Sequence, residues 1–233
     1  MKKHMSLLLL IIFLATSPGL KGFKIKEPAY QKKTSYSPEQ SYVFEIIKNR
    51  RTVREFKSTP VPEEHVLKIL EAAHFAPTAG NQQPWKFLVI QDRVQLDLLS
   101  EAALDWYADK YERQKNVSQE EIQNLRVRLE KILKKVLSAP VYVAVLVDSH
   151  AKYPDYILYD GTLAAGYMMI AARSLGYGTG FFTTFFPEKQ MKEFFQIPDR
   201  YKLICFSPIG VPVQWPETPP KKDIQDLIVF ESF

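Results

Sequence analysis

The chain has 233 residues, of which 46% are hydrophobic and 24% charged. This is the composition of a folded globular protein, and it excludes a disordered, collagen-like or multi-span membrane chain. The single cysteine excludes an intrachain disulfide and any multi-cysteine metal or redox motif. Three lysines lie within the first 22 residues; without them 28 basic residues face 26 acidic ones, so the net charge falls from +5 to +2. A nucleic-acid-binding domain usually carries a larger basic excess, so we expect no nucleic-acid partner.

Residues 1–22 have the pattern of a signal peptide. Lys2 and Lys3 precede an unbroken apolar run over residues 7–14, and small residues follow it. The run is shorter than the roughly 20 residues of a membrane span, which favours a cleaved signal over an uncleaved anchor or a buried helix. Lysines ahead of the run predict export, to the periplasm or the medium, with membrane attachment only if the leader stays uncleaved. Polar residues 23–39 are expected to form a linker or arm, and residues 40–233 the folded domain.

Hydrophobic spacing predicts helices and strands without strict alternation. A short helix with Val43, Ile46 and Ile47 on its apolar face ends near Asn49, and a second helix begins at Pro62. Strands are expected over residues 85–90, 141–147, 177–184 and 201–209. Two helical stretches separate the first two strands, and Ser118 with Glu121 forms a capping box that opens the second of them. Helices flanking a few strands in this order predict an α+β layered fold.

Two segments in the C-terminal half of the chain are strongly apolar. Residues 155–175 read as a long helix that is apolar on most sides and must be buried all round, with small residues suited to close packing, including packing across a subunit boundary. Residues 224–230 are predicted to be an apolar, extended arm.

No side chain stands out as an acid, base, nucleophile or metal ligand. His65, His74 and His150 lack metal-ligand spacing, so no metal site is expected. Cys205 lies in an apolar run, and a buried structural thiol is favoured over a nucleophile. Three glycines at 176, 178 and 180 follow a helix and precede a strand, which is the wrong order for a dinucleotide-binding loop. The first of them is better interpreted as a helix C-cap.

Two polar segments are more informative. Arg50-Arg51-Thr52-Val53-Arg54 places three guanidinium groups and a hydroxyl within five residues, a set that suits a phosphate, although a solvated basic turn would look the same. Residues 76–85, Ala-Pro-Thr-Ala-Gly-Asn-Gln-Gln-Pro-Trp, form an amide-rich loop between a helix and a strand. Such a loop either forms hydrogen bonds with the edge of a heterocyclic ligand or serves only as a structural connection that is stabilised by its own hydrogen bonds.

Together the two segments resemble the nitroreductase family of FMN-dependent flavoproteins. The family pattern has R-R-S-x-R after its first helix and A-P-S-x-x-N-x-Q-P-W before its first strand, and the resemblance extends over residues 40–230. It implies a three-layer fold with a mixed, mainly antiparallel sheet flanked by helices. It also implies an intertwined homodimer with an extended C-terminal arm. Each flavin would then be held by two chains.

The resemblance also implies site residues. FMN would be held by Arg50, Arg51, Thr52, Arg54, Pro77, Thr78, Ala79, Asn81, Phe182, Thr183 and Lys221, with the loop residues coming from the partner chain. The substrate would lie beside Gly80, Trp106, Tyr107 and Tyr111. The implied activity is ping-pong transfer of hydride from NAD(P)H to nitroaromatic, quinone-like or related small acceptors. The flavin carries this chemistry, so no catalytic side chain is required.

Two alternatives remain open. The iodotyrosine deiodinase branch of the family clamps an amino-acid zwitterion with a Glu, a Tyr and a Lys. Tyr111 matches the Tyr, but Tyr107 and Leu133 stand at the other two positions, unless a shifted register brings in Lys134. The second alternative is a non-catalytic exported flavin-binding protein, because NAD(P)H is scarce outside the cytoplasm.

Overall fold

The computed structural model describes residues 37–113, 117–183 and 185–232. The predicted leader and nearly all of the expected linker lie outside the described residues. The chain divides after Pro38, and the fold below is that of the unit Glu39–Phe233. In the part of the chain that is described, no helix has the length and hydropathy to cross a membrane.

Four strands form one sheet in the order β1-β2-β4-β3, and every pair in it is antiparallel. These strands are β1 (Trp85–Ile90), β2 (Val141–Asp148), β3 (Gly178–Thr179) and β4 (Tyr201–Gly210). Strand β2 lies in the centre between β1 and β4, and all but its last residue are buried. A strand covered on both faces reads as a continuous apolar run, as this one does.

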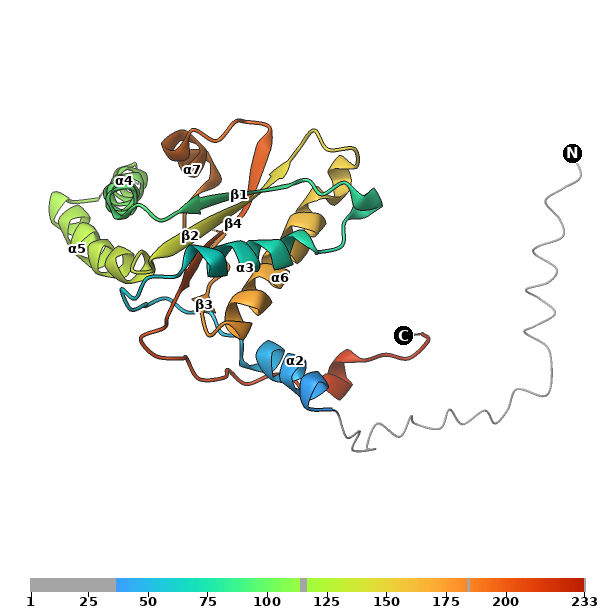
Figure 1. Cartoon of the computed structure of the whole chain (residues 1–233). Helices are drawn as coiled ribbons and strands as arrows, with labels where there is room; N and C mark the ends of the chain where they lie inside the picture. The colour runs from blue at the N-terminus through green and yellow to red at the C-terminus, as the bar shows by residue number, and fades with distance from the viewer. Residues whose placement is uncertain (1–36, 114–116, 184, 233) are drawn as a thin grey trace, which may run out of the picture. The chain divides into compact units, whose positions relative to one another are not determined.

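Helices cover both faces of the sheet (Figure 1). Alternate residues of β2 point to opposite faces. Its odd-numbered valines pack into one hydrophobic core with α3 (Glu63–His74) and α6 (Ile157–Ser174). Tyr142, Ala144 and Leu146 pack into the other core, with α4 (Arg93–Glu112), α5 (Gln119–Val136) and α7 (Glu188–Phe195). The result is a helix–sheet–helix sandwich of the α+β class, as predicted.

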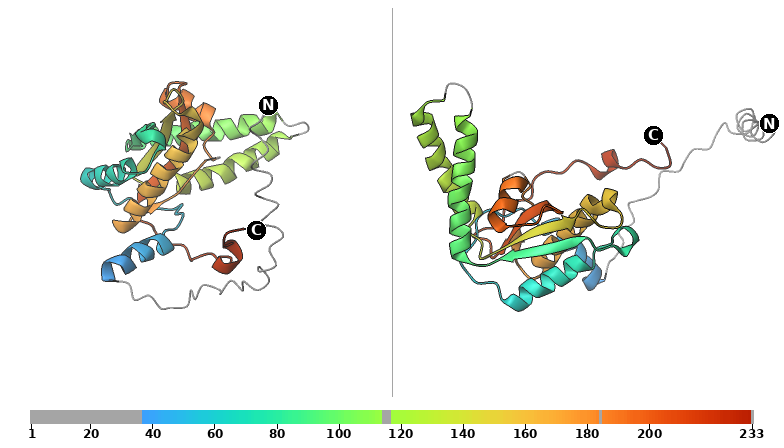
Figure 2. Two further views of the ribbon diagram at one scale, coloured as in Figure 1. Left: turned by 90° about the vertical axis from the view of Figure 1, so that its right-hand side faces the viewer. Right: turned by 90° about the horizontal axis from the view of Figure 1, so that it is seen from above.

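Helices α4 and α5 form an antiparallel hairpin that extends beyond the sheet (Figure 2). The predicted capping box is confirmed, because Ser118 accepts from the Glu121 N–H and Glu121 accepts from the Ser118 N–H. Asp92 caps α4 by accepting from the Val94 N–H at 2.9 Å. An Arg126–Asp105 ion pair of 2.9 Å joins the two helices and sets their register.

Two apolar helices are only partly covered within a single chain. Helix α6 is not buried all round, because the side facing away from the sheet exposes Leu158, Tyr159, Leu163 and Tyr167. The apolar face predicted for α2 (Pro38–Asn49) is likewise open, with Val43 and Ile47 about half exposed. In both helices the apolar residues exceed what the sheet of a single chain can cover.

The C-terminal third differs from prediction in three respects. The strand expected over 177–184 shrinks to β3, after which the chain leaves the ladder and only Phe182 makes an isolated bridge, to Phe206. Helix α7 was not predicted, because its eight residues are fewer than the roughly 11–18 over which helical periodicity is recognised. Residues Ile224–Leu227 form a 3-10 turn rather than an extended strand, and residues 221–232 are exposed. The sheet is not mixed among the described residues, since the one parallel pairing is an isolated bridge between Thr52 and Thr179.

Candidate functional site

The arginine-rich segment lies between β3 and the chain that leaves β4. The Val53 N–H donates to the Thr179 carbonyl at 2.8 Å, and the Lys57 N–H donates to the Val211 carbonyl at 2.8 Å. Val53 and Phe56 are buried in the core that also contains α4 and α5. These backbone hydrogen bonds hold the segment as an extended, strand-like run, and the buried side chains of Val53 and Phe56 anchor it in the core.

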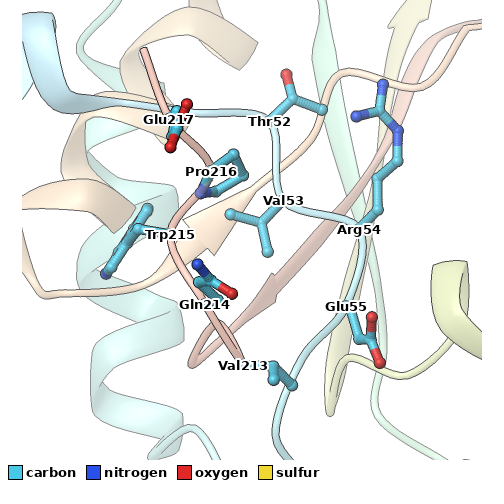
Figure 3. A pocket seen from close by; sticks show the side chains of 9 residues that line it. All are labelled: Thr52, Val53, Arg54, Glu55, Val213, Gln214, Trp215, Pro216 and Glu217. Carbon is cyan, nitrogen blue, oxygen red and sulfur yellow. The ribbon is translucent and has the colours of Figure 1, made fainter.

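In an extended run, successive side chains point to opposite sides. Thr52 and Arg54 point to one side, whereas Val53 points to the other, towards Gln214 (Figure 3). Neither Arg50, which is half-buried, nor the exposed Arg54 forms a side-chain hydrogen bond or ion pair with another described residue. These two guanidinium groups are therefore available to bind an anion.

The Arg51 side chain, by contrast, forms hydrogen bonds within the chain. One of its terminal nitrogens donates to the Lys48 and Arg50 carbonyls, the latter at 2.7 Å, and the other donates to the Thr218 hydroxyl. The first of these bonds satisfies a carbonyl in the last turn of α2, which has no partner within the helix. Arg51 thus ties the end of α2 to the C-terminal segment, three residues before the exposed Lys221.

A cavity of about 320 Å³ opens between the arginine-rich segment and the chain after β4. Residues 52–55 line one side and residues 213–217 the other (Figure 3). Trp215 forms part of the lining, and the Arg173 guanidinium lies 3.8 Å from the centre of its ring. Sequence reasoning missed both residues, because their pairing joins the last turn of α6 to a loop 42 positions later.

The segment expected at the flavin edge follows β3 directly. Phe182 exchanges backbone hydrogen bonds with Phe206, at 3.3 and 2.9 Å, and its ring is 9% exposed. The ring packs over Gly180, where an added Cβ would lie 2.6 Å from it. Phe182 therefore faces the core, and Thr183 is the exposed side chain of the pair.

The amide-rich loop contains the backbone strain of the site. Its 3-10 turn η1 (Ala79–Asn81) follows α3, and Gly80, Asn81 and Gln83 have positive φ angles of 53°, 56° and 47°. Non-glycine residues seldom adopt this region. Gly80 also lies against the Tyr153 ring, where a Cβ would come within 2.3 Å. Pro77 and Asn81 are exposed, and Thr78 and Ala79 are half-buried.

A polar network holds this loop. Gln82 receives a hydrogen bond from the Tyr153 N–H at 2.7 Å and donates to the Tyr153 carbonyl at 3.1 Å. Its amide nitrogen also donates to the Asp160 carboxylate at 2.7 Å, and the Ala79 N–H donates to the same carboxylate at 3.1 Å. Sequence reasoning missed Asp160, although an acid within an otherwise apolar helix was the available signal.

The two groups of expected cofactor residues lie at opposite ends of α6. The amide-rich loop is bonded to Asp160 in the first turn of this helix, whereas Thr52 pairs with Thr179 just after its end. With 1.5 Å of rise per residue, these points are about 20 Å apart along the helix axis. One chain therefore does not bring the loop next to the arginine-rich segment.

The aromatic residues of α4 are engaged within the chain. Tyr107 donates its hydroxyl to the Phe185 carbonyl at 2.7 Å, and burial raises the pKa of this phenol. Trp106 makes an edge contact with Phe194, with ring centres 6.4 Å apart. Both residues line a cavity of about 380 Å³ between α4 and α7, whereas the half-buried Tyr111 is not part of that lining.

Cys205, His65 and His74 are each buried or engaged in contacts within the chain. Cys205 is fully buried, and burial raises the pKa of its thiol to about 12, so it stays protonated near neutral pH. His65 lies 2.7 Å from the Tyr177 hydroxyl, and His74 receives a 3.4 Å contact from the Trp85 indole. Within the described ranges, no three His, Cys, Asp or Glu side chains gather as a metal cluster would require.

Residues 47–211 match the model of the nitroreductase family, and the chain belongs to that family. It is 29% identical over 180 residues to a candidate NADH dehydrogenase/NAD(P)H nitroreductase of Methanothermobacter thermautotrophicus, covering 76% of this chain and 80% of the relative. It is 26% identical over 171 residues to an iodotyrosine deiodinase of Thermotoga neapolitana, covering 73% and 88% of the two chains.

The fold is also similar to solved structures. The chain superimposes with a TM-score of 0.67 on a crystal structure of oxidized iodotyrosine deiodinase bound to FMN and 3-iodo-L-tyrosine, at 22% identity. The match covers 82% of this chain and all of the other. At this level of identity the similarity establishes the nitroreductase-like fold.

Proposed function

We propose that the chain is an FMN-dependent oxidoreductase that takes hydride from NAD(P)H and passes it to small flat acceptors, such as nitroaromatic compounds or quinones, by a ping-pong mechanism. The observation that carries the proposal is the pair of unengaged guanidinium groups, Arg50 and Arg54, flanking Thr52 beside a cavity. Relatives with FMN or NAD(P)H in their names support the same class.

The residues present fit an FMN phosphate. Two arginines and a hydroxyl match a phosphate dianion, and each charge-assisted hydrogen bond contributes about 1.5–3 kcal/mol. Arg51 holds the chain at Thr218, from which Lys221 can approach the same anion. Thr183, exposed after β3, would border the ring system. Bound FMN would supply both hydride acceptance and hydride donation, while this chain's residues bind the cofactor and shape the pocket.

We further propose that the active species is a homodimer, with the amide-rich loop of one copy completing the site of the other. Two features support this. The loop lies about 20 Å from the arginine-rich segment of its own chain, as measured along α6. In addition, α6 exposes four large apolar side chains on one face, and Gly166 on the same helix has no atom within 4 Å of an added Cβ. Such a face packs closely against a second helix.

A deiodinase activity is the second candidate, favoured by the relatives that carry this name. The geometry argues against it. Leu133 is fully buried in the core, and the Tyr107 hydroxyl is already engaged with Phe185. Lys134 lines a different cavity, together with Arg93 and Asp97 of α4. These two α4 residues lie ten or more positions before Tyr107 on the same helix, which corresponds to about 15 Å or more along its axis. Neither position assigned to the lysine of the clamp therefore places a cation beside Tyr107; the cations that line the Tyr107 cavity are Lys110, Arg113 and Lys189.

Two measurements test the function. The absorption spectrum of the purified protein, with and without added FMN, reports cofactor binding. Stopped-flow oxidation of the reduced protein by nitrofurazone, menadione and iodotyrosine reports the acceptor. We expect fast reaction with the first two and little with iodotyrosine. Rapid, saturable oxidation by iodotyrosine with iodide release would establish the deiodinase instead. FMN binding without reduction of the bound flavin by added NAD(P)H would indicate a non-catalytic flavin-binding protein.

A further inference from the structure

Asp160 is the one carboxylate that is buried among the described residues, at 3% exposure. It lies in the first turn of α6, next to Gly161, where the helix approaches β2 and β4 so closely that an added Cβ would come within 2.5 Å of Val147. Burying a carboxylate is costly unless hydrogen bonds replace its lost water. The partners of Asp160 therefore indicate why an acid occupies this position.

Both oxygens of the carboxylate are directed at the amide-rich loop. Oδ1 accepts from the Ala79 N–H at 3.1 Å, and Oδ2 accepts from Gln82 Nε2 at 2.7 Å. The Gln82 side-chain amide cannot rotate by half a turn to exchange its oxygen and nitrogen. Its Oε1 accepts from the Tyr153 N–H and its Nε2 donates to the Tyr153 carbonyl, so rotation would lose both bonds. The position opposite Gln82 thus requires an acceptor.

The loop needs such support because of its backbone. Gly80, Asn81 and Gln83 all have left-handed φ angles, and each such residue other than glycine costs on the order of 1–3 kcal/mol. The Gln83 backbone N–H donates a hydrogen bond to Thr78 Oγ1 at 3.3 Å. A conformation of this kind persists only when neighbouring groups fix it from several sides. Asp160 contacts Ala79, directly before the strained stretch, and Gln82, within it.

We propose that Asp160 is a positioning residue for the cofactor. Its carboxylate fixes residues 78–83 in the strained conformation, and this sets the surface that the loop presents to the FMN held by the other copy. The inference rests on the proposed function for the identity of the cofactor. The fixing of the loop is a property of this chain and can be measured without any cofactor.

The test compares Asp160→Asn with Tyr142→Phe. An amide at 160 has only one acceptor oxygen, so it cannot accept from both Ala79 and Gln82, and its nitrogen would face whichever of these two donors the oxygen leaves. Tyr142 is the matched control, because it is also fully buried with two hydrogen bonds, to Val136 and Ala139, but lies away from the loop. Gln82→Ala provides a second variant that leaves the α6 core intact and removes the loop's own amide.

The first measurement is backbone amide hydrogen exchange over residues 77–85 in the protein without FMN. We expect Asp160→Asn and Gln82→Ala to speed exchange at Ala79 by about tenfold or more, and Tyr142→Phe to leave it unchanged. The exchanged pair Asp160→Asn with Gln82→Glu restores a donor facing an acceptor between positions 82 and 160, while it loses the bond from position 82 to the Tyr153 carbonyl, and it should recover part of the protection. Unchanged exchange in both Asp160→Asn and Gln82→Ala would overturn the proposal.

The second measurement is FMN affinity by fluorescence titration of the same variants. We expect Asp160→Asn to weaken binding by about tenfold or more, with Tyr142→Phe close to the unmodified protein. Equal affinity of Asp160→Asn and Tyr142→Phe would show that the loop's conformation does not serve the cofactor. If the unmodified protein binds no FMN, the proposed function and the role towards FMN both fail, while the exchange experiment still decides whether Asp160 fixes the loop.

Discussion

At the scale of single residues, three arginines that are close in the sequence differ in their hydrogen-bond partners. Arg51 turns back onto the end of α2 and out to Thr218, where it satisfies main-chain and hydroxyl oxygens. Arg50 and Arg54 keep their donors free of other described residues. A guanidinium that already donates to carbonyls has fewer donors left for a phosphate, so the three arginines are not equivalent.

We expect Arg50→Ala and Arg54→Ala each to weaken FMN binding by roughly tenfold to over a hundredfold, because each removes a charged hydrogen bond worth about 1.5–3 kcal/mol. Fluorescence titration measures the change. Arg93→Ala is the control, since it also removes one positive charge but pairs with Asp97 and the Leu137 carbonyl. Equal affinities across the three variants would remove the phosphate assignment.

At the scale of elements, the α4–α5 hairpin carries Trp106 and Tyr107 and is held by a few local contacts. The capping box begins α5, the Arg126–Asp105 pair joins the helices, and the Tyr107 hydroxyl holds α4 to Phe185. The outward faces of both helices are largely polar but also expose Leu98 on α4 and Val127 on α5. The stability of this element therefore depends on its cap and on its few buried residues.

Ser118→Ala should lower the free energy of unfolding by about 1 kcal/mol, because it removes the side-chain acceptor for the Glu121 N–H. Urea denaturation measures the change, with Gln123→Ala on the exposed face of the same helix as the control. No difference between the two variants would mean that α5 does not contribute to the cooperative unit that urea unfolds.

The capping box also predicts a pH dependence. Hydrogen bonds from the Ser118 backbone and side chain lower the pKa of Glu121 below its ordinary value of 4.5. A carboxyl whose pKa is lower in the folded state contributes stability above its unfolded pKa, and loses it as pH falls through the folded pKa. The difference between the unmodified protein and Ser118→Ala should therefore narrow below about pH 4.

At the scale of the whole molecule, most of the large apolar side chains that are exposed in the described part of the chain lie on three segments. They gather on α6, on α2 and on the C-terminal segment, which together expose Tyr42, Val43, Phe44, Ile47, Leu158, Tyr159, Leu163, Tyr167, Ile224, Leu227, Ile228, Val229 and Phe230. A monomer would expose an apolar surface of the kind that marks protein–protein contacts. The homodimer proposal rests on this distribution and on the separation of the two halves of the site.

Leu163→Glu should convert the proposed dimer to a monomer and abolish tight FMN binding, because it places a charge at the centre of the apolar face of α6. Leu98→Glu is the matched control, since Leu98 is a similarly exposed leucine on the unrelated helix α4. Light scattering gives the mass, and fluorescence gives the FMN affinity. A monomeric Leu163→Glu protein that binds FMN as tightly as the unmodified one would refute the composite site.

Much of this protein follows from its sequence alone. The strand over 85–90, the capping box at Ser118 and the α+β class are confirmed, and so is membership of the nitroreductase family. These features are local, because strand periodicity, caps and short motifs depend on residues within a few positions of one another. The polar run at 50–54 and the amide-rich loop were likewise recognisable before any contact was known.

Only the tertiary structure decided how these pieces are used. It showed that α6 leaves one face open, that Arg51 is engaged while Arg50 and Arg54 are free within the described residues, and that the Tyr107 hydroxyl is already bonded. It placed the loop and the arginine-rich segment at opposite ends of α6, and it revealed Asp160 as the partner of the loop in the first turn of that helix. Each of these facts depends on contacts between residues far apart in the chain, which the spacing of residue types along a sequence does not encode.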